Sequence, residues 1–439
     1  MSRRLQSLTL LPLLTLALTA CGSSSGSVRS SSSSVAPTSA SPLTPQTFVA
    51  GHGCAALIAN ANGEVAGRIY HEASSGADVA EAVHRVQSSS ALRSAIAAGQ
   101  ASTADGVLND LLVNQIVDIE IVKGSGVFAS AGAGRAIAPV RGPIPGTDAH
   151  FVLTTQAAHT YTQVVQQVTG AEVLLLSGGG VPGASQTRQI AGTLTVSARA
   201  AGIPTSGPIE IEKRKYEVTS LAGSVFPSGA MRIALLVPSA GSRCSGSAEE
   251  TRIETLGHVG ERIYREEAHS AYVLAVLRKI EADASFQRAV SDREEPAIRA
   301  AIVSFFAAHI HVVRVRVYAV EPSGAQRFLY DLGGPYVLAP VHGSVRSAGK
   351  LVGRFSMAIQ DDAGYVKLAQ RFTGAEVLMR RGSAQVMGTL DPGPPHVPDR
   401  GSLEYREQRY EAYSFTGEAF PSGPLRISLL VPSRKPIGG

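Results

Sequence analysis

The sequence predicts an α+β protein with two tandem domains, each a long N-terminal helix packed on a mainly antiparallel sheet. The first observation is a repeat: Phe226-Pro-Ser-Gly returns as Phe420-Pro-Ser-Gly and Arg68-Ile-Tyr as Arg262-Ile-Tyr, both 194 residues later (420 − 226 and 262 − 68). The second is that each copy starts with apolar residues at helical spacing and continues with alternating strands. A repeat of this length makes each copy a domain with its own core, not one unit of a solenoid.

Length and composition fit two globular domains with short extensions. With 44% hydrophobic and 17% charged residues, the 439-residue chain has ordinary globular composition. We expect a first domain over 49–238, a linker over 239–248, a second domain over 249–432 and a tail over 433–439. The formal net charge of +5 is spread without a dense Lys/Arg stripe, which argues against a nucleic-acid partner.

The N-terminus is typical of a targeting segment. Arg3 and Arg4 precede a short apolar run, Leu8 to Leu18, and residues 1–20 are predicted to be a lipoprotein signal peptide. Leu18-Thr-Ala-Cys21 resembles the lipobox of bacterial lipoproteins, which implies cleavage before Cys21 and acylation of its thiol. The alternative is ordinary secretory cleavage beside an incidental cysteine. The export route, general or twin-arginine, stays open.

A Ser-rich stretch over 21–48 is predicted to be a disordered tether between the lipid and the domains. After the signal peptide, no stretch reaches the roughly 18 apolar residues of a membrane span. We therefore expect a protein anchored by lipid to the extracytoplasmic face of the cell membrane.

The helices are predicted from apolar spacing. Residues 249–290 of the second copy and 64–98 of the first each read as one long amphipathic helix. Ser291-Asp292 offers a cap for a second helix that contains Pro296 in its first turn. Asp361 and Asp362 are placed to cap a small helix over 364–372.

The strands are predicted from period-two alternation, and those of the second copy are the clearer set. In the first of them, Val313, Val315 and Val317 share one face. The expected strands of this copy are 312–320, 327–331, 351–360, 376–380, 385–390, 410–415 and 425–431. The first copy follows the same order.

This order of elements, with a small helix between antiparallel strands, is PAS-like. Its most informative stretches are Arg314–Tyr318, Gly333–Pro340, Val352–Asp362 and Thr373–Leu378. In them the chain resembles the Cache family of bacterial extracytoplasmic sensor domains, also called PDC sensors, over both copies. The resemblance implies recognition of a small extracellular molecule, often a carboxylate or an amino acid, for sensing or delivery. Because this chain is expected to be lipid-anchored, any signal would need a membrane-spanning partner.

Polar side chains collect on the predicted sheet face of the second copy that points away from the long helix. Guanidinium and phenol groups there would suit a carboxylate or phosphate through charge-assisted hydrogen bonds. The candidate ligand-binding residues are Arg314, Arg316, Tyr318, Tyr330, Tyr336, Arg354, Ser356 and Gln360. The alternative is an ordinary solvated strand face, or ion pairs from Arg314 and Arg316 to the first copy.

The first copy inverts the charge of the matching strand. Asp118 and Glu120 stand where the second copy has arginines, and His150, Val152 and Thr154 follow on the neighbouring strand. We therefore predict that only the second copy binds an anion. The alternative function is a structural or interaction lipoprotein in which both pockets are vestigial.

We expect neither an enzyme nor a bound metal or cofactor. His309 and His311 share a strand face but lack a third ligand. With Cys21 acylated, Cys54 and Cys244 remain, and both lie outside the reducing cytoplasm. We predict a disulfide between them, worth about 5 kcal/mol for a loop of this length; the alternative is two free thiols.

Overall fold

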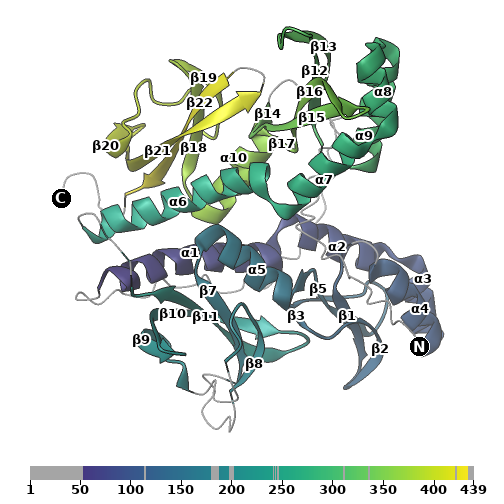
Figure 1. The fold of residues 1–439 in the computed structure, drawn as a ribbon. Helices are drawn as coiled ribbons and strands as arrows, with labels where there is room; N and C mark the ends of the chain where they lie inside the picture. The colour runs from purple at the N-terminus through teal and green to yellow at the C-terminus, as the bar shows by residue number, and fades with distance from the viewer. Residues whose placement is uncertain are drawn as a thin grey trace, which may run out of the picture. The chain divides into compact units, whose positions relative to one another are not determined.

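The computed structural model describes residues 53–112, 115–178, 187–196, 202–240, 242, 244, 247–309, 312–334, 337–420 and 423–433. These residues form an α+β fold with long helices against antiparallel sheets, which confirms the predicted class (Figure 1). One unit, Cys54–Gly439, holds both copies of the repeat. Within the described residues, no helix combines the length and hydropathy that a membrane span needs.

The first copy begins with α1, and its elements run in the order that the repeat predicts. Its helices are α1 Cys54–Ser75, α2 Ala77–Ser88, α3 Ser90–Ala97, α4 Ala101–Leu112 and α5 Ala158–Thr169. Its strands are β1 Asp118–Lys123, β2 Gly126–Gly132, β3 Ala136–Ile137, β4 Val140–Pro143, β5 Ala149–Thr154, β6 Gln156–Ala157, β7 Glu172–Ser177, β8 Arg188–Gly192, β9 Ser206–Ile211, β10 Arg214–Val225 and β11 Gly229–Pro238.

The second copy repeats this series. Its helices are α6 Ala248–His269, α7 Ala271–Ala282, α8 Ala284–Asp292, α9 Glu295–Ala308 and α10 Asp362–Thr373. Its strands are β12 Arg314–Val320, β13 Gln326–Gly333, β14 Val337–Leu338, β15 Val341–Ser347, β16 Lys350–Ala358, β17 Gln360–Asp361, β18 Glu376–Arg381, β19 Ala384–Gly388, β20 Arg400–Tyr405, β21 Gln408–Phe420 and β22 Gly423–Pro432.

Each copy contains two antiparallel sheets, where the sequence pattern indicates one. The smaller sheets are ordered β2-β1-β5-β4 and β13-β12-β16-β15. The larger sheets are ordered β6-β3-β10-β11-β7-β8 and β17-β14-β21-β22-β18-β19, with β9 on β10 and β20 on β21. The two copies therefore have identical strand connections, as a duplicated domain should.

The long helix predicted for the second copy is broken twice. Ser270 and Asp283 have extended backbones, and their side chains accept the amide protons of Val273 and Phe286. Each of them thus begins a new helix, α7 or α8, because a capping oxygen replaces the missing helical partner. Asp292 ends α8 instead of capping the next helix, and α9 begins at Glu295.

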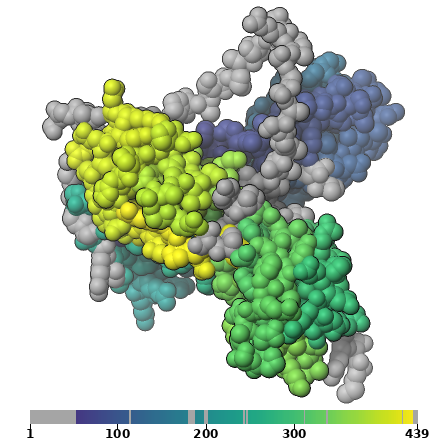
Figure 2. Space-filling view, turned by 90° about the horizontal axis from the view of Figure 1, so that it is seen from above, coloured from purple at the N-terminus to yellow at the C-terminus, as the bar shows by residue number. Residues whose placement is uncertain are grey.

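The smaller sheet of each copy packs on the short helices. In the second copy, Phe286 of α8 and Phe305 of α9 meet Phe355 of β16 in a closed apolar cluster. The first copy has the equivalent cluster between α2–α4 and its small sheet. Figure 2 shows the α7–β16 part of the second copy (green) as a lobe distinct from its C-terminal sheet (yellow).

The larger sheets and the long helices share one hydrophobic core, so the prediction of a separate core for each copy is wrong there. The cluster includes Val65 of α1 and Tyr161 of α5 together with Ile263 of α6 and Tyr365 of α10. In Figure 1, α1 and α6 lie side by side between the two larger sheets. Burying both helices against each other removes apolar surface that each copy alone would expose.

Equivalent residues make equivalent contacts across this interface. Gly170 and Gly374 have φ of 72° and 68° and end α5 and α10. A Cβ on Gly170 would lie 2.4 Å from the guanidinium of Arg262, and a Cβ on Gly374 would lie 2.4 Å from that of Arg68. Each arginine thus lies against the C-terminal end of a helix in the other copy, where the helix dipole favours a positive charge.

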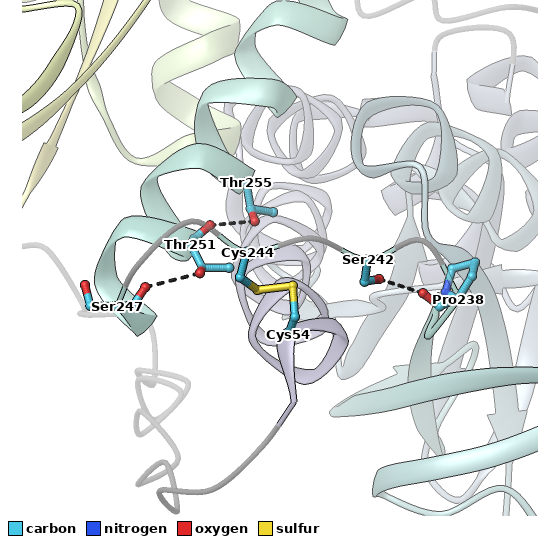
Figure 3. The surroundings of a disulfide bond; sticks show 7 residues. All are labelled: Cys54, Pro238, Ser242, Cys244, Ser247, Thr251 and Thr255. Carbon is cyan, nitrogen blue, oxygen red and sulfur yellow. Dashed lines mark hydrogen bonds between the residues drawn. A yellow bond between two sulfur atoms is a disulfide. The ribbon is translucent and has the colours of Figure 1, made fainter.

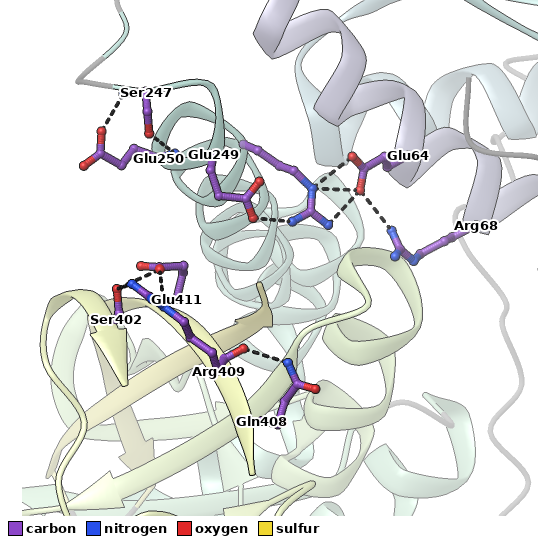
Figure 4. A network of polar contacts seen from close by, with 10 residues as sticks. Glu64, Arg68, Ser247, Glu249, Glu250, Ser402, Gln408, Arg409 and Glu411 are labelled. Carbon is purple, nitrogen blue, oxygen red and sulfur yellow. Dashed lines mark hydrogen bonds and ion pairs between the residues drawn. The ribbon is translucent and has the colours of Figure 1, made fainter. Parts of the chain in front are cut away.

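Ion pairs also join the copies. Arg252 of α6 lies 3.0 Å from the Glu64 carboxylate of α1 and 3.2 Å from Glu249. Figure 4 shows Glu64, Arg68 and Glu249 converging on this contact. Arg371 of α10 reaches Glu72 of α1 at 3.2 Å.

Cys54 and Cys244 are joined by a disulfide, the pair that the sequence predicts (Figure 3). Their Cα atoms are 5.5 Å apart, and 190 residues separate them in the chain. The bond ties the first residue of α1 to the segment that precedes α6. It therefore closes the first copy at the point where the second begins.

Candidate functional site

The predicted binding face lies on β12, a central strand of the second copy's smaller sheet. Val315 and Val317 are fully buried against the helices, whereas Arg314, Arg316 and Tyr318 alternate onto the opposite face. This is the arrangement that period-two alternation predicts. The strands β13 and β16 flank β12 and carry the remaining polar groups of the face.

Arg314 is held by a partner within its own sheet. Its Nε and Nη2 atoms donate to the two carboxylate oxygens of Asp331 at 2.8 and 2.7 Å, and its Nη1 donates to the Gly334 carbonyl at 3.0 Å. The hydrogen bond with Asp331 raises the pKa of Arg314. The guanidinium also lies 5.3 Å from the ring centre of Phe420. Arg314 therefore has a structural role, with Asp331 of its own sheet as its ion-pair partner.

Arg316 shares the same carboxylate and lies beside two aromatic rings. Its Nε atom lies 3.1 Å from Asp331. Its guanidinium lies 5.4 Å from the ring centre of Phe328 and 6.0 Å from that of Tyr318. Two guanidinium groups are thus balanced by one carboxylate, which leaves a net positive charge on the face.

The neighbouring strands add a hydroxyl and an imidazole group in the same row as Arg316. Ser356 is opposite Arg316 on β16, and His342 is opposite Ser356 on β15. The Ser356 Oγ and the His342 Nδ1 are 2.9 Å apart. Arg354 lies opposite Tyr318 and is exposed. One face of the sheet therefore brings together Arg316, Tyr318, Arg354, His342 and Ser356, of which Ser356 is buried.

His342 escapes the sequence prediction because β15 is not predicted as a strand. A signal was present: Val341, Gly343 and Val345 alternate with polar residues. Gly343 interrupts the apolar pattern because the Phe355 ring fills the space where its side chain would stand; a Cβ there would lie 2.3 Å from that ring.

Two predicted residues lie elsewhere. Tyr330 is opposite Val317 and packs against the helix-facing core, because a bulge after Val317 shifts the register of β13. Gln360 belongs to β17 and pairs with Leu338 of the larger sheet, because the chain leaves the smaller sheet after Ala358. Tyr336 lies outside the described residues, as does Cys21.

The matching face of the first copy is organised differently. Asp118 occupies the position of Arg314 and accepts a hydrogen bond from the Gly134 amide at 2.7 Å. Burial raises the pKa of Asp118, and the hydrogen bond from Gly134 lowers it in part. Val152 and Arg141 replace Ser356 and His342 in the corresponding row. Asp118 and Arg314 thus carry opposite charges at the same strand position. Each hydrogen-bonds to the backbone of the segment that follows the neighbouring edge strand.

The predicted pair of histidines cannot be placed as a pair, because His311 lies outside the described residues. Burial lowers the pKa of His309, and the charge of Lys279 adds to this. Among the residues that the structure describes, no group of three or more His, Cys, Asp or Glu is arranged to hold a metal ion.

Comparison with known proteins gives little further information. No family model matches the chain, and no curated protein matches its sequence. One similar solved structure is an extracellular ligand binding receptor from Desulfohalobium retbaense, with 11% sequence identity and a TM-score of 0.26. The alignment covers 52% of this chain and 47% of that chain, so it spans about half of the receptor.

Proposed function

We propose that the chain is a lipid-anchored, non-enzymatic binding protein on the extracytoplasmic face of a cell membrane. Its ligand is a small anion held on the face formed by β13, β12, β16 and β15. The lipobox-like sequence at Cys21 supports the anchor and the location. A signalling role would then require a membrane-spanning partner, because a lipid anchor does not carry a conformational change across the bilayer.

The observation that carries the ligand class is charge. The four strands of this sheet contain six Arg or Lys residues and a single carboxylate, Asp331. The equivalent strands of the first copy contain two of each sign. An excess of basic groups on one copy alone favours an anionic ligand there, because guanidinium groups bind carboxylate and phosphate through paired, charge-assisted hydrogen bonds.

Each residue has a definable part in this proposal. Arg354 is exposed and supplies the strongest donors, while the Ser356 hydroxyl and the His342 ring lie beside it as further partners. Arg314 acts through Asp331, whose carboxylate holds Arg316 in place beside the aromatic rings. Tyr318 and Phe328 offer apolar surface for the carbon skeleton of an organic acid.

The test is a calorimetric and thermal-shift screen of the full chain against carboxylic acids, amino acids and inorganic phosphate. We expect a hit whose affinity falls at least about tenfold in Arg354→Ala and in Arg316→Ala, the loss of one charge-assisted contact. Arg327→Ala is the matched control, because Arg327 is on the same sheet but pairs with Glu321 at 3.2 Å. The sheet-face site is rejected if no ligand binds, or if no ligand that binds loses affinity in these two variants.

The anchor is tested separately by mass spectrometry of the mature chain. Acyl chains on Cys21 and a membrane-bound chain are expected, and Cys21→Ala should release the protein into the soluble fraction. An unacylated mature N-terminus would remove the basis for the proposed location.

A second function, docking of another envelope protein, is favoured by one observation. Phe328 is 53% exposed, and Val127 at the matching place in the first copy is 58% exposed. Both lie on edge strands, β13 and β2, whose free backbone groups can pair with an added strand. This function would be supported over the first if no ligand binds in the screen and if a partner protein loses its binding in Phe328→Ser.

A further inference from the structure

A second group of basic side chains lies on the larger sheet of the second copy. Arg380 of β18 and Arg426 of β22 are directly opposite each other in the strand register. The other face of these strands is apolar and packs in the shared core. The two arginines face the segment 394–399, which covers this side of the sheet through contacts with both guanidinium groups.

The hydrogen bonds of the two arginines are incomplete. Arg380 is only 8% exposed and donates from its Nη atoms to the carbonyl oxygens of Pro394 and Pro395. Arg426 donates to the Ser414 hydroxyl at 3.3 Å and lies 2.7 Å from an Asp399 oxygen. The Nε atoms of both arginines are buried and have no hydrogen-bond partner among the described residues.

Two hydroxyl groups complete the surroundings. Ser414 and Ser428 occupy the next row of the sheet, and their Oγ atoms are 2.8 Å apart. Both serines are buried, at 8% and 2% exposure. The region therefore holds four hydrogen-bonding side chains in a protected position on a sheet.

The charges in this region are poorly balanced. Burial lowers the pKa of Arg380, and the neighbouring positive charge of Arg426 lowers it further. Arg426 is 35% exposed and its partner Asp399 is 85% exposed, so this ion pair is largely screened by solvent and does little to balance the buried charge of Arg380. Burying a charge and an unpaired donor costs free energy unless a partner is present.

The first copy shows that the fold does not require this arrangement. There Arg232 and Ser220 stand in the places of Arg426 and Ser414, but Leu176 and Ala234 replace Arg380 and Ser428. Leu176 and Ala234 lie in an apolar cluster, and Arg232 donates to the Ile203 carbonyl at 2.7 Å. The first copy therefore builds this part of the fold without a second arginine. The Nε of Arg232 is also buried without a hydrogen-bond partner among the described residues, so the feature particular to the second copy is the pair of facing guanidinium groups with two serine hydroxyls.

We propose that Arg380, Arg426, Ser414 and Ser428 form a binding site for one small oxyanion, a carboxylate or a phosphate. The anion accepts hydrogen bonds from the two unpartnered Nε atoms and neutralises the facing guanidinium groups. The exposed Asp399 carboxylate is displaced from Arg426 when the anion enters. This site lies on a different sheet from the proposed sheet-face site and does not depend on it.

The experiment is isothermal titration calorimetry of the full chain with inorganic phosphate and, separately, with malonate, at constant ionic strength. We expect one of these anions to bind, and its affinity to fall at least about tenfold in Arg380→Leu and in Arg426→Gln. Arg380→Leu installs the residue that the first copy carries at this place. Without the anion, it should unfold at the same or a higher temperature than wild type, because a buried charge next to a second guanidinium group is gone.

Two controls separate this site from others. Arg232→Gln makes the same change at the matched position of the first copy and should leave anion binding unaltered. Arg354→Ala changes the sheet-face site and should also leave it unaltered. The inference is overturned if neither anion binds wild type, or if folded Arg380→Leu and Arg426→Gln chains bind it as tightly as wild type does. Preference for malonate over phosphate, or the reverse, identifies the class of ligand.

Discussion

A partly buried carboxyl, Glu267 on α6, adds a pH dependence to the stability of the chain. Burial raises its pKa from an ordinary 4.5 to about 7, and the nearby Glu266 contributes. Between these values the folded chain keeps a proton that the unfolded chain releases. Stability is therefore full below about pH 4.5 and decreases as the pH rises through 7. We expect Glu267→Gln to abolish this decrease, which amounts to up to about 3 kcal/mol.

Urea unfolding at pH 5 and pH 8 measures the effect. Wild type should be less stable at pH 8 than at pH 5, while Glu267→Gln should change little between them. Glu404→Gln, at an exposed position of β20, should keep the wild-type dependence. If Glu267→Gln keeps it too, another group controls the pH response.

The sequence predicts which residues of the candidate site share a face along one strand, but not how that strand pairs with its neighbours. Arg316, Tyr318, Arg354 and Ser356 come together because alternation along a strand places such residues on one face. The displacement of Tyr330 depends on a bulge, which is a property of two paired strands and is not encoded in either one alone. The arginine pair of the larger sheet requires knowledge of which strands are neighbours, because 46 residues separate its members (426 − 380).

The two small helices, α5 and α10, differ at the N-cap residue that precedes each of them, and this difference offers a matched test. Asp361 accepts a hydrogen bond from the Gly364 amide and caps α10, whereas Ala157 precedes α5 and has no side-chain oxygen. We expect Asp361→Ala to destabilise the chain by about 1 kcal/mol and Ala157→Asp to stabilise it by a smaller amount. Both are measured by urea unfolding at pH 7. Equal stability of Asp361→Ala and wild type would mean that packing alone fixes the start of α10.

The elements that the sequence predicts best are those with a long, regular pattern. The strands β12, β18 and β22 and the helix α10 lie close to their expected positions, because their apolar faces are buried in a core. The two-residue strands, such as β14 and β17, are too short to show alternation. The long helix is broken by Ser270 and Asp283, residue types that also occur inside helices, so the apolar spacing runs on across both breaks.

For the whole molecule, the repeat predicts two similar copies but not the way in which they associate. The structure packs α1 against α6 in one apolar core. Arg68 and Arg262 each lie against the C-terminal end of a helix in the other copy. A sequence pattern shows that a helix face is apolar, but it does not show whether that face meets its own sheet or another helix. The shared core leads us to expect one cooperative unfolding transition for both copies.

The disulfide between Cys54 and Cys244 stabilises the chain by restricting its unfolded state. Cys54 and Cys244 are 190 residues apart, and closing a loop of this size restricts the unfolded chain. In the chain-entropy model this is worth about 5 kcal/mol. We expect a Cys54→Ser/Cys244→Ser double variant to lose up to this amount in urea unfolding. Either single variant should lose as much, because one remaining thiol cannot close the loop.

Because the copies share a core, the loss of stability in the disulfide variants should affect both copies together. Because α1 and α6 are buried against each other, weakening the first copy exposes apolar surface of the second. The double variant should therefore unfold at lower urea in one transition, with near-ultraviolet and far-ultraviolet signals changing together. Wild type in reducing agent should follow the same curve. Two separated transitions, with only the first moved by reduction, would show that the copies unfold independently and that the core between them contributes little cooperativity.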